Sequence, residues 1–371
     1  MKVIDNVKEF ISTPSHSGET GEMESLVASK VGEIADVEFL QVRNLGRDVV
    51  SKVIHDDSLP TIVLNGHLDT VAVCKGWTKE PFEPTIEGDK LYGLGSADMK
   101  AGVAVAIEAF RMLADLGTVN VTFAGTIDEE GDSTGAFALL DRKFAGADSS
   151  FSRSGGIKGD LCLIMEPSNG TLMMGCRGRL VFEILIHGIS AHGAVPHEGV
   201  NAIEEASRFI CALEKMEHLD HHILGKGSST VLAMEGGTST LSVPESCRIK
   251  LDRHYVPGEN MDSCLEQLKE AAASFSAEAE FDIHPDPARK TPFLDPYITP
   301  DDGMAGHFCQ SIGAEYAYGR SVGDYNAFSK AMPTVVYGPK GENWHSADEW
   351  VSISSIKECL DGYRSYAASL K

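Results

Sequence analysis

The chain has 371 residues, of which 42% are hydrophobic and 23% are charged, so it is too apolar for a disordered protein and long enough to form two domains. Its 32 Lys and Arg residues stand against 55 Asp and Glu residues, which gives a formal net charge of -23 at pH 7. A chain of this charge repels phosphate backbones and anionic membranes, so we expect neither nucleic acid nor a membrane surface as a partner.

The amino-terminal residues and the cysteines bear on the compartment. Residues 1–10, MKVIDNVKEF, lack the long apolar region of a secretory signal, and no run of about 18 apolar residues occurs elsewhere. The eight cysteines are scattered along the chain and form no CxxC pair. Because unpaired, scattered cysteines are typical of a reducing compartment, we expect a cytoplasmic protein.

Short hydrophobic runs alternate with a helical pattern in the first part of the chain. Residues 61–66, 119–127 and 161–165 have the character of buried strands, and residues 100–117 have the apolar spacing of a helix. Strands and helices that alternate in this way predict an α/β fold with a mainly parallel sheet.

From about residue 180 the pattern changes to that of a second, inserted domain. The expected strand, helix, strand, strand, helix and strand cover residues 180–188, 201–216, 229–235, 246–256, 260–275 and 279–285. A Pro-rich segment follows, and a buried strand at residues 334–339 then returns to the first domain. We therefore predict one domain of residues 1–177 and 290–371, and an inserted βαββαβ domain of residues 178–289.

Acids and histidines follow the predicted strands and one Gly-rich turn, at the edge where a parallel sheet binds its ligands. They are His67, Asp69, Asp98, Glu129, Glu130, Glu166 and His345. Imidazole together with carboxylate oxygen suits Zn²⁺, Mn²⁺ or Co²⁺, and so dense an acidic cluster needs cations to hold it together. The sequence therefore predicts a metal centre, although each of these residues taken alone also fits an ordinary polar loop.

Two close pairs among these residues suggest more specific roles. His67 and Asp69 are two residues apart, so in an extended segment Asp69 can accept the ring N–H of a metal-bound His67. Glu129 and Glu130 are adjacent, and adjacent carboxylates repel each other. One of them can ligate a metal while the other transfers protons, and a solvated acidic loop is the alternative.

Several common motifs are incomplete or absent. The segment YGLGSAD begins like a dinucleotide-binding loop, but Asp98 stands in place of the third glycine. The sequence contains no GxxxxGK[ST], HExxH or GxSxG motif. A phosphate-binding loop and a serine nucleophile elbow are therefore not supported.

At these residues the sequence resembles the family of dinuclear zinc amidohydrolases and peptidases that includes acetylornithine deacetylase, succinyl-diaminopimelate desuccinylase, aminoacylase and glutamate carboxypeptidase. The matching stretches, in the family's order, are GHLDTV (66–71), LYGLGSADMKAG (91–102), DEEGDSTGA (128–136), MEPS (165–168), HGISAHGAVPHEGVNAI (187–203), LDRHYVPGE (251–259) and WHSADEWV (344–351). The resemblance implies a metal-binding catalytic domain and an inserted domain that serves as lid and in dimerisation.

The resemblance also implies how the metals are held. Two zinc ions, which cobalt or manganese can replace, would be bridged by Asp98. His67 and Glu166 would complete one site, and Glu130 and His345 would complete the other. Two cations held in this way activate a water molecule and polarise the scissile carbonyl.

Further residues gain roles from the same resemblance. Glu129 would be the general base, because it is not a ligand, and Asp69 would orient a metal-bound histidine. His192 matches a histidine that reaches across a dimer into the partner's active site and stabilises the oxyanion. Arg253 matches a basic residue that binds the carboxylate of the substrate. A surface histidine and an arginine in a surface ion pair are the alternatives for the last two.

One departure from the family concerns the segment GGTSTLSVP at residues 236–244. Many relatives carry an asparagine there that contacts the substrate, whereas this chain has Leu241 and Ser242. Substrate recognition is expected to differ at this point.

These observations lead to one expected function and several alternatives. We expect a homodimeric two-metal amidohydrolase that removes an acyl group from, or cleaves a peptide-like bond to, a small amino acid with a free carboxylate, most similar to acetylornithine deacetylase. A succinyl-diaminopimelate desuccinylase or a small-peptide carboxypeptidase is the first alternative. A binding protein that has lost catalysis and a serine or cysteine hydrolase are remoter ones, and sensitivity to chelators separates the last from a metal enzyme.

Overall fold

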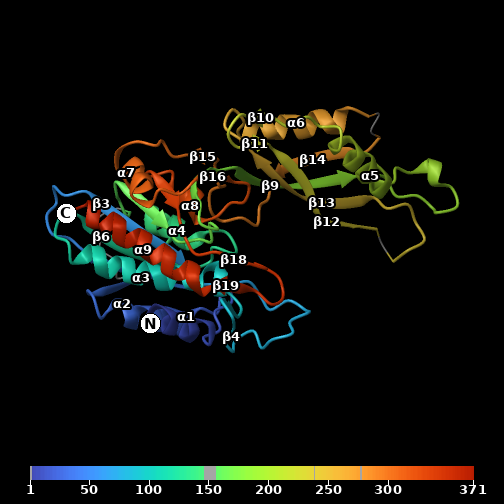
Figure 1. Ribbon diagram of the computed structural model, residues 1–371. Coiled ribbons are helices and arrows are strands. Elements are labelled where there is room, and N and C mark those ends of the chain that lie inside the picture. Colours follow the sequence, from blue (N-terminus) through green and yellow to red (C-terminus); the bar gives the residue numbers. More distant parts are fainter. Residues whose placement is uncertain (1, 146–155, 238, 276–277) are drawn as a thin grey trace. The chain divides into compact units, whose positions relative to one another are not determined.

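The computed structural model describes residues 2–145, 156–237, 239–275 and 278–371. The chain folds into two compact units (Figure 1). The first comprises Met1–Gly175, Ile298–Tyr318 and Gly323–Lys371, and the second comprises Cys176–Tyr297 and Gly319–Val322. Each unit is built around a main sheet of its own.

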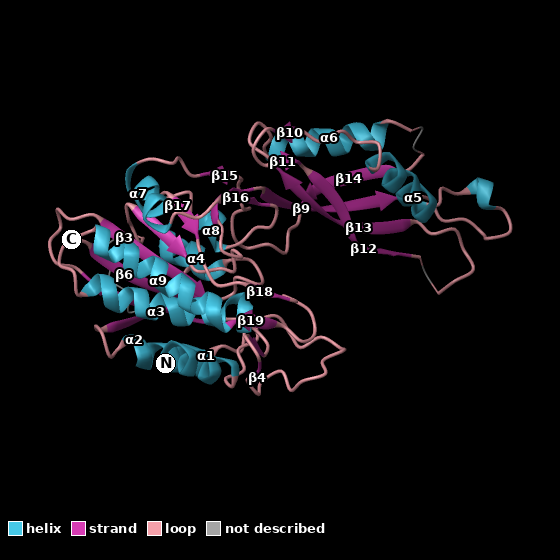
Figure 2. Cartoon of the chain, in the orientation of Figure 1, coloured by secondary structure: helices cyan, strands magenta, loops and turns pink. Residues whose placement is uncertain are grey.

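The first unit is built on a nine-stranded sheet (Figure 2), in the order β1-β2-β6-β3-β7-β17-β8-β15, with β16 paired to β8. The bounds are β1 Val37–Val42, β2 Gly46–Val53, β3 Thr61–His67, β6 Asn120–Thr126, β7 Leu161–Ile164, β8 Leu172–Cys176, β15 Tyr297–Ile298, β16 Tyr316–Gly319 and β17 Thr334–Val336. The central strands β6, β3, β7 and β17 are parallel, whereas β1, β2 and β8 are antiparallel to their neighbours. The prediction of an α/β fold with a mainly parallel central sheet is confirmed.

The helices of the first unit are α1 Lys2–Ile11, α2 Gly21–Val31, α3 Ala101–Ala114, α4 Thr134–Leu140, α7 Gly303–Ile312, α8 Asp324–Phe328 and α9 Ile353–Ser369. Helix α3 packs on β3 and β6 and lies beside α1 and α9 (Figure 1). Because neighbours surround it on several sides, nearly all of its side chains are buried, which explains the sequence AGVAVAIEAFRMLA. The helix begins directly after the Gly-rich turn.

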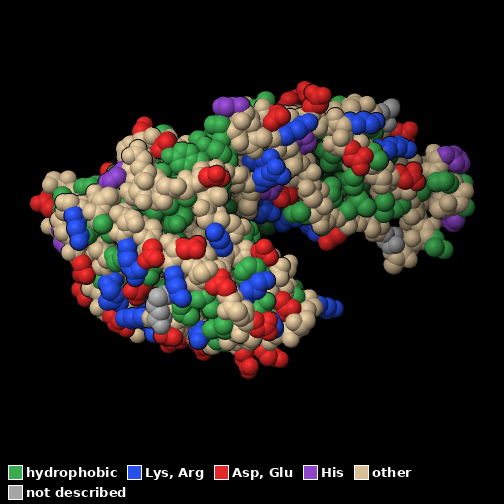
Figure 3. All heavy atoms as spheres, in the orientation of Figure 1, with side chains coloured by type: hydrophobic (Ala, Val, Ile, Leu, Met, Phe, Trp, Pro, Cys, Tyr) green, Lys and Arg blue, Asp and Glu red, His purple; other side chains and the backbone are tan. Residues whose placement is uncertain are grey.

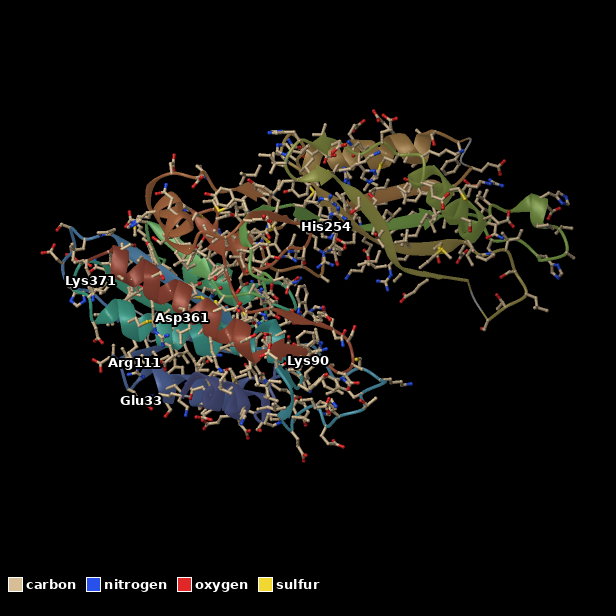
Figure 4. All side chains as sticks on the ribbon, in the orientation of Figure 1. Glu33, Lys90, Arg111, His254, Asp361 and Lys371 are labelled. Carbon is tan, nitrogen blue, oxygen red and sulfur yellow. The ribbon has the colours of Figure 1, made fainter. Side chains whose placement is uncertain are left out.

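A second, smaller sheet in this unit joins two segments that are far apart in the sequence. It is antiparallel, in the order β18-β19-β5-β4, with bounds β4 Thr85–Glu87, β5 Lys90–Tyr92, β18 Gly341–Glu342 and β19 Trp350–Ser352. The ammonium of Lys90 (labelled in Figure 4) lies 3.9 Å from the centroid of the Trp350 ring, a cation–π contact across the pair. The sheet thus holds the residues after β5 close to the residues before β19.

The second unit is an antiparallel sheet in the order β12-β13-β9-β14 with two helices packed on it (Figure 2). Its elements are β9 Gly178–His187, α5 Ala202–Leu213, β10 Asp220–His221, β11 Gly225–Lys226, β12 Ser228–Gly236, β13 Ser246–Tyr255, α6 Met261–Ala273 and β14 Glu280–Pro285. Alternate residues of the strands, such as Phe182, Ile184 and Ile249, form a buried core with Phe209 and Leu268 of the helices. The predicted strand and helix order is confirmed, and the short β10–β11 hairpin is an addition.

The surface mixes charges of both signs. On the face shown in Figure 3, acidic and basic side chains are interspersed. Arg111 and Glu33, both labelled in Figure 4, form one such exposed pair, with 3.5 Å between Nη2 and Oε2. Within the described part of the chain, the helices lack the length and apolar character that crossing a membrane requires.

Candidate metal centre

The first group of side chains forms where β3 and β7 end and where the turn Ser96–Lys100 leads into α3. His67 is the last residue of β3, and its Nε2 lies 3.0 Å from Asp98 Oδ1 and 3.3 Å from Glu166 Oε1. His67 and Glu166 are buried, and one ligand atom from each of the three lies within 4.8 Å of the other two. The three side chains therefore make a compact donor set of one imidazole and two carboxylates.

A second group shares Asp98 with the first. His345 Nε2 lies 3.0 Å from Glu130 Oε2 and 3.4 Å from Asp98 Oδ2, so the two oxygens of one carboxylate face two different histidines. Asp98, Glu130 and His345 again offer ligand atoms within 4.8 Å of one another. Ligand atoms within 4.8 Å of one another are also offered by His67, Glu129 and Glu130. The structure thus brings together all six candidate ligands and bases of the predicted centre.

Parallel strand pairing explains why these residues meet. The register of β3 with β6 places His67 opposite Thr126, so the loop that carries Glu129 and Glu130 begins beside the end of β3. The β3–β7 register places Glu166 just beyond the next strand end. Asp98 lies in a π-type turn, Ser96–Lys100, that leads into α3. The carboxyl ends of adjacent parallel strands form one edge, as the sequence predicts.

Burial and mutual contact dominate the electrostatics of the centre. Burial raises the pKa of Glu166 to about 8, with the charge of Asp98 adding to the shift. Hydrogen bonds to Asp98 and Glu130 raise the pKa of His345 to about 10. Burial opposes ionisation of Asp98, but hydrogen bonds from His345 and His67 prevail and hold its pKa well below the usual range. The imidazoles and carboxylates face one another at positions where a divalent cation could offset the charge of the carboxylates.

The donor set fits divalent transition metals. Imidazole nitrogen with carboxylate oxygen is the ligand chemistry of catalytic zinc sites, and manganese and cobalt accept the same donors. Each of the two groups around Asp98 supplies three protein ligands, which leaves further coordination positions for water or substrate. Glu129 is half-buried, and the burial of its carboxylate raises its pKa well above the usual value.

Asp69 has contacts that differ from the expected ones. The Nδ1 atom of His67 lies 2.9 Å from the main-chain oxygen of Asp69 and 3.7 Å from its carboxylate Oδ1. The carboxylate instead accepts the main-chain N–H groups of Glu129 and Glu130, at 3.2 Å and 3.3 Å, and the hydroxyl of Ser17 at 2.6 Å. Asp69 therefore holds His67 by its main chain and the two glutamates by its side chain.

Sequence reasoning missed the segment that lies against Glu129. A Cβ atom at Gly323 would overlap Oε1 of Glu129, so the absence of a side chain there leaves room for that carboxylate. The next residue, Asp324, is buried and accepts a hydrogen bond from Thr126 at 2.6 Å. The sequence contains a signal for this contact only in the adjacent pair Gly-Asp, which is too short to be specific.

In the second unit, His192 lies in an exposed loop. Its Nδ1 accepts the main-chain N–H of Ala194 at 3.0 Å. The loop pairs with the segment that departs from the family pattern, because Gly193 donates to the carbonyl of Leu241 at 3.0 Å and His192 forms a bridge with Ser242. The side chain of Leu241 is 92% exposed. Leu241 and Ser242 therefore support the His192 loop through their main chain.

Arg253 lies in the interior of the second unit. The resemblance predicts that it offers its guanidinium to a substrate, but the side chain is fully buried inside the second unit. It forms an ion pair with Glu259 and donates to Gln267 at 3.1 Å and to the carbonyl of His254 at 2.6 Å. The partners of the guanidinium named here all lie within the unit, and its contact with a substrate carboxylate stays a prediction.

Comparisons with known proteins agree with this chemistry. Residues 63–369 match the model of peptidase family M20/M25/M40. An acetylornithine deacetylase of Edwardsiella ictaluri is 27% identical over 376 residues, which cover 94% of this chain and 92% of the relative. A succinyl-diaminopimelate desuccinylase of Rhizorhabdus wittichii is 27% identical over 319 residues, which cover 82% and 80%.

Solved structures show the same fold. The crystal structure of a tripeptidase from Staphylococcus aureus has a TM-score of 0.79 to this one, with 18% sequence identity, over 100% of this chain and 98% of that chain. An aminopeptidase from Bacillus cereus has a TM-score of 0.76 and 20% identity, over 99% of this chain and 98% of that chain. Both likenesses extend over the whole chain, so both units belong to the shared fold.

Proposed function

The chain belongs to peptidase family M20/M25/M40 and is a hydrolase, and from this premise we propose that it is a two-metal amidohydrolase acting on small N-acylated amino acids. The observation that carries the proposal is the position of Asp98, whose two carboxylate oxygens face His67 and His345. The deacetylase at 27% identity supports removal of an acetyl group from an amino acid such as ornithine. The desuccinylase, with similar identity, supports a succinylated diamino acid as the alternative substrate.

In this proposal Asp98 would contribute to both metal sites. His67 and Glu166 would hold one ion, and Glu130 and His345 would hold the other, with zinc as the proposed metal and cobalt or manganese able to replace it. When bound, the ions supply Lewis-acid chemistry, which polarises the scissile carbonyl and makes a water molecule a better nucleophile.

Glu129 carries the proton transfer. Its carboxylate takes a proton from the attacking water and returns a proton to the nitrogen of the leaving amine. Its half-buried position supports this exchange because burial raises the pKa of its carboxylate well above the usual value. Asp69 keeps Glu129 in place through the main-chain N–H, and the missing side chain at Gly323 leaves space for the carboxylate.

We propose that the second unit acts in dimerisation and as a lid, with the functional division at residues 1–177 and 290–371 against 178–289. In a homodimer His192 would donate a hydrogen bond to the oxyanion formed in the partner's active site. The exposed loop position of His192 supports this role, because its side chain is accessible to a second chain. The eight free cysteines, six of them buried, support a reducing, cytoplasmic setting.

The decisive experiment is a substrate panel. The protein, loaded with Zn²⁺ or Co²⁺, is offered N-acetylornithine, N-succinyl-diaminopimelate, N-acyl neutral amino acids and dipeptides, and released amine is measured. We expect one substrate to dominate, and activity to disappear with a chelator and return with metal. Activity that survives complete metal removal would contradict the proposal and favour a covalent hydrolase. Two bound metals without hydrolysis of any member would favour the catalytically silent binding protein.

The dimer role is tested separately with His192→Ala. The variant is expected to keep its metal content and its mass in solution and to lose kcat by about 100- to 1,000-fold, the usual effect of removing one oxyanion donor. Sedimentation velocity and steady-state kinetics are the measurements. A wild-type kcat in this variant would return His192 to the role of a surface histidine.

A further inference from the structure

Glu349 holds the turn that carries Asp98. The side chain of Glu349 is 1% exposed and lies against the main chain of residues 95–98, within the first unit. Its Oε2 accepts the N–H of Gly95 at 2.7 Å, and its Oε1 accepts the N–H groups of Ala97 and Asp98 at 2.9 Å and 3.0 Å. One carboxylate therefore accepts three main-chain hydrogen bonds, from three of four consecutive residues.

The turn needs such an acceptor because its main chain is irregular. Asp98 and Met99 depart from helical dihedral angles, with φ and ψ of -112° and 92° and of -132° and 37°. Gly95 has a left-handed φ of 72°, and a Cβ there would lie 2.6 Å from Cγ2 of Thr70. Main-chain N–H groups buried in such a turn must find partners outside it, and Glu349 supplies them.

The main chain at Glu349 is also bound to the segment that precedes the turn. Its main-chain oxygen accepts the N–H of Gly93 at 3.1 Å, and the following residue, Trp350, pairs with Tyr92 in the small sheet. Side chain and main chain of Glu349 thus fix the same turn from two directions. A displacement of Glu349 would move Asp98 relative to the rest of the sheet.

Glu349 also belongs to the segment that delivers His345. The two residues are four positions apart, and the loop between them is held by Asp348, whose carboxylate accepts the N–H and the hydroxyl of Thr78 at 2.9 Å and 2.7 Å. His345 and Asp348 both have left-handed φ values, of 56° and 57°. A short and conformationally restricted segment therefore contains the candidate ligand His345 and also Glu349, which fixes the turn of the candidate ligand Asp98.

We propose that Glu349 is a positioning residue that holds Asp98 between the two metal sites and couples its position to His345. This inference rests on the proposed two-metal function. Both oxygens of Glu349 are occupied by N–H donors, so it acts through Asp98 and not as a ligand. A glutamine cannot replace it, because its NH₂ group would face an N–H donor where an acceptor is needed.

The test measures metal affinity rather than turnover. Zn²⁺ binding to the whole protein is titrated in competition with a chromogenic chelator for the wild type, Glu349→Gln, Glu349→Asp and Glu24→Gln. Glu24 is the matched control, because it is also a buried glutamate of the first unit that accepts a main-chain N–H, from Arg47 at 3.0 Å. Circular dichroism verifies that each variant is folded.

We expect Glu349→Gln to bind Zn²⁺ about 10- to 100-fold more weakly than the wild type, as is typical when a partner of a metal ligand is removed. Glu349→Asp keeps the charge, but its shorter side chain moves the carboxylate oxygens away from the N–H donors, so it is also expected to weaken Zn²⁺ binding. If Glu349→Gln does not fold, Glu349→Asp is the variant that tests the inference. Glu24→Gln is expected to retain wild-type affinity.

Three results would overturn the inference. They are wild-type affinity in Glu349→Gln, an equal loss in Glu24→Gln, and a loss in Glu349→Gln with none in Glu349→Asp, which would indicate a long-range charge effect. Failure of the wild type to bind two ions would instead refute the proposed function, so the two failures are distinguishable.

Discussion

The carboxylate of Asp69 accepts the main-chain N–H of Glu129, with 3.2 Å between Oδ1 and N. The same carboxylate accepts the N–H of Glu130 at 3.3 Å. Asp69 thus fixes the turn that presents both the proposed base and a proposed ligand, while its main-chain oxygen contacts His67. A single residue ties together two strand ends, and its replacement should disturb the geometry of proton transfer.

Asp69→Asn should therefore lower kcat by about 10- to 100-fold, the usual effect of losing a buried partner of this kind. The new NH₂ group would face a main-chain N–H, or would displace the hydroxyl of Ser17. The measurement is steady-state kinetics with metal analysis of the same samples. Ser17→Ala removes only one hydrogen bond and is the milder control. Equal kcat values for Asp69→Asn and wild type would show that the main-chain contact to His67 is sufficient.

Glu129→Gln should keep both metals and lose activity by about 100- to 10,000-fold, the range for removal of a general base. The substitution preserves the size of the side chain but not its ability to take a proton. Elemental analysis and kinetics are performed together. Because Glu129 also lies within reach of His67 and Glu130, loss of one metal ion in this variant would make it a ligand instead.

Arg253→Leu should destabilise the protein and leave KM unchanged. Removing the arginine leaves Glu259 buried without its cation, which typically costs about 3 to 5 kcal/mol. Thermal unfolding and KM are measured together, and Arg253→Leu combined with Glu259→Leu should recover part of the loss. An increased KM with unchanged thermal stability would restore Arg253 to the substrate site.

Asp48→Asn should become more stable relative to the wild type as the pH rises. Asp48 is fully buried, and burial raises its pKa well above the usual value, with the charges of neighbouring carboxylates adding to the effect. The folded state then retains a proton that the unfolded chain releases above about pH 3.9. The wild type therefore loses stability as the pH rises from there towards the pKa of the folded state, by about 1.4 kcal/mol per pH unit. Asparagine mimics the protonated form and does not titrate.

The measurement is the difference in Tm between Asp48→Asn and the wild type from pH 3 to pH 8. Asp56 is the control with the opposite sign, because hydrogen bonds from Ser58 lower its pKa. Asp56→Asn should become less stable relative to the wild type as the pH rises to about 4, where the carboxyl of the unfolded chain ionises. A pH-independent difference for Asp48→Asn would mean that the carboxyl has an ordinary pKa.

The sequence predicts most of the centre because strand ends of a parallel sheet share one edge. His67, Glu130 and Glu166 each follow a recognisable hydrophobic run, so their meeting follows from the fold class. The partners that hold these residues are less predictable. Glu349 contacts a turn about 250 residues away, and nothing in the local pattern of either segment indicates the contact.

Arg253 illustrates the limit of periodicity. A strand pattern predicts which face a residue occupies but not whether a charged side chain there meets solvent or a buried partner. In this chain Glu259, six residues on, returns to pair with it after a turn. The role of the arginine is therefore decided by tertiary contact and not by the strand that carries it.

The part of the chain that matches the family model begins at residue 63. The unit that contains the metal centre also includes the residues before it. Strand β2 pairs with β6, helix α1 packs on α3, and Ser17 donates to Asp69, so the first 60 or so residues are built into the working fold. A chain shortened to begin at residue 63 would expose the edge of β6 and invite aggregation. The segment that matches the family model is therefore shorter than the segment that the first unit needs in order to fold.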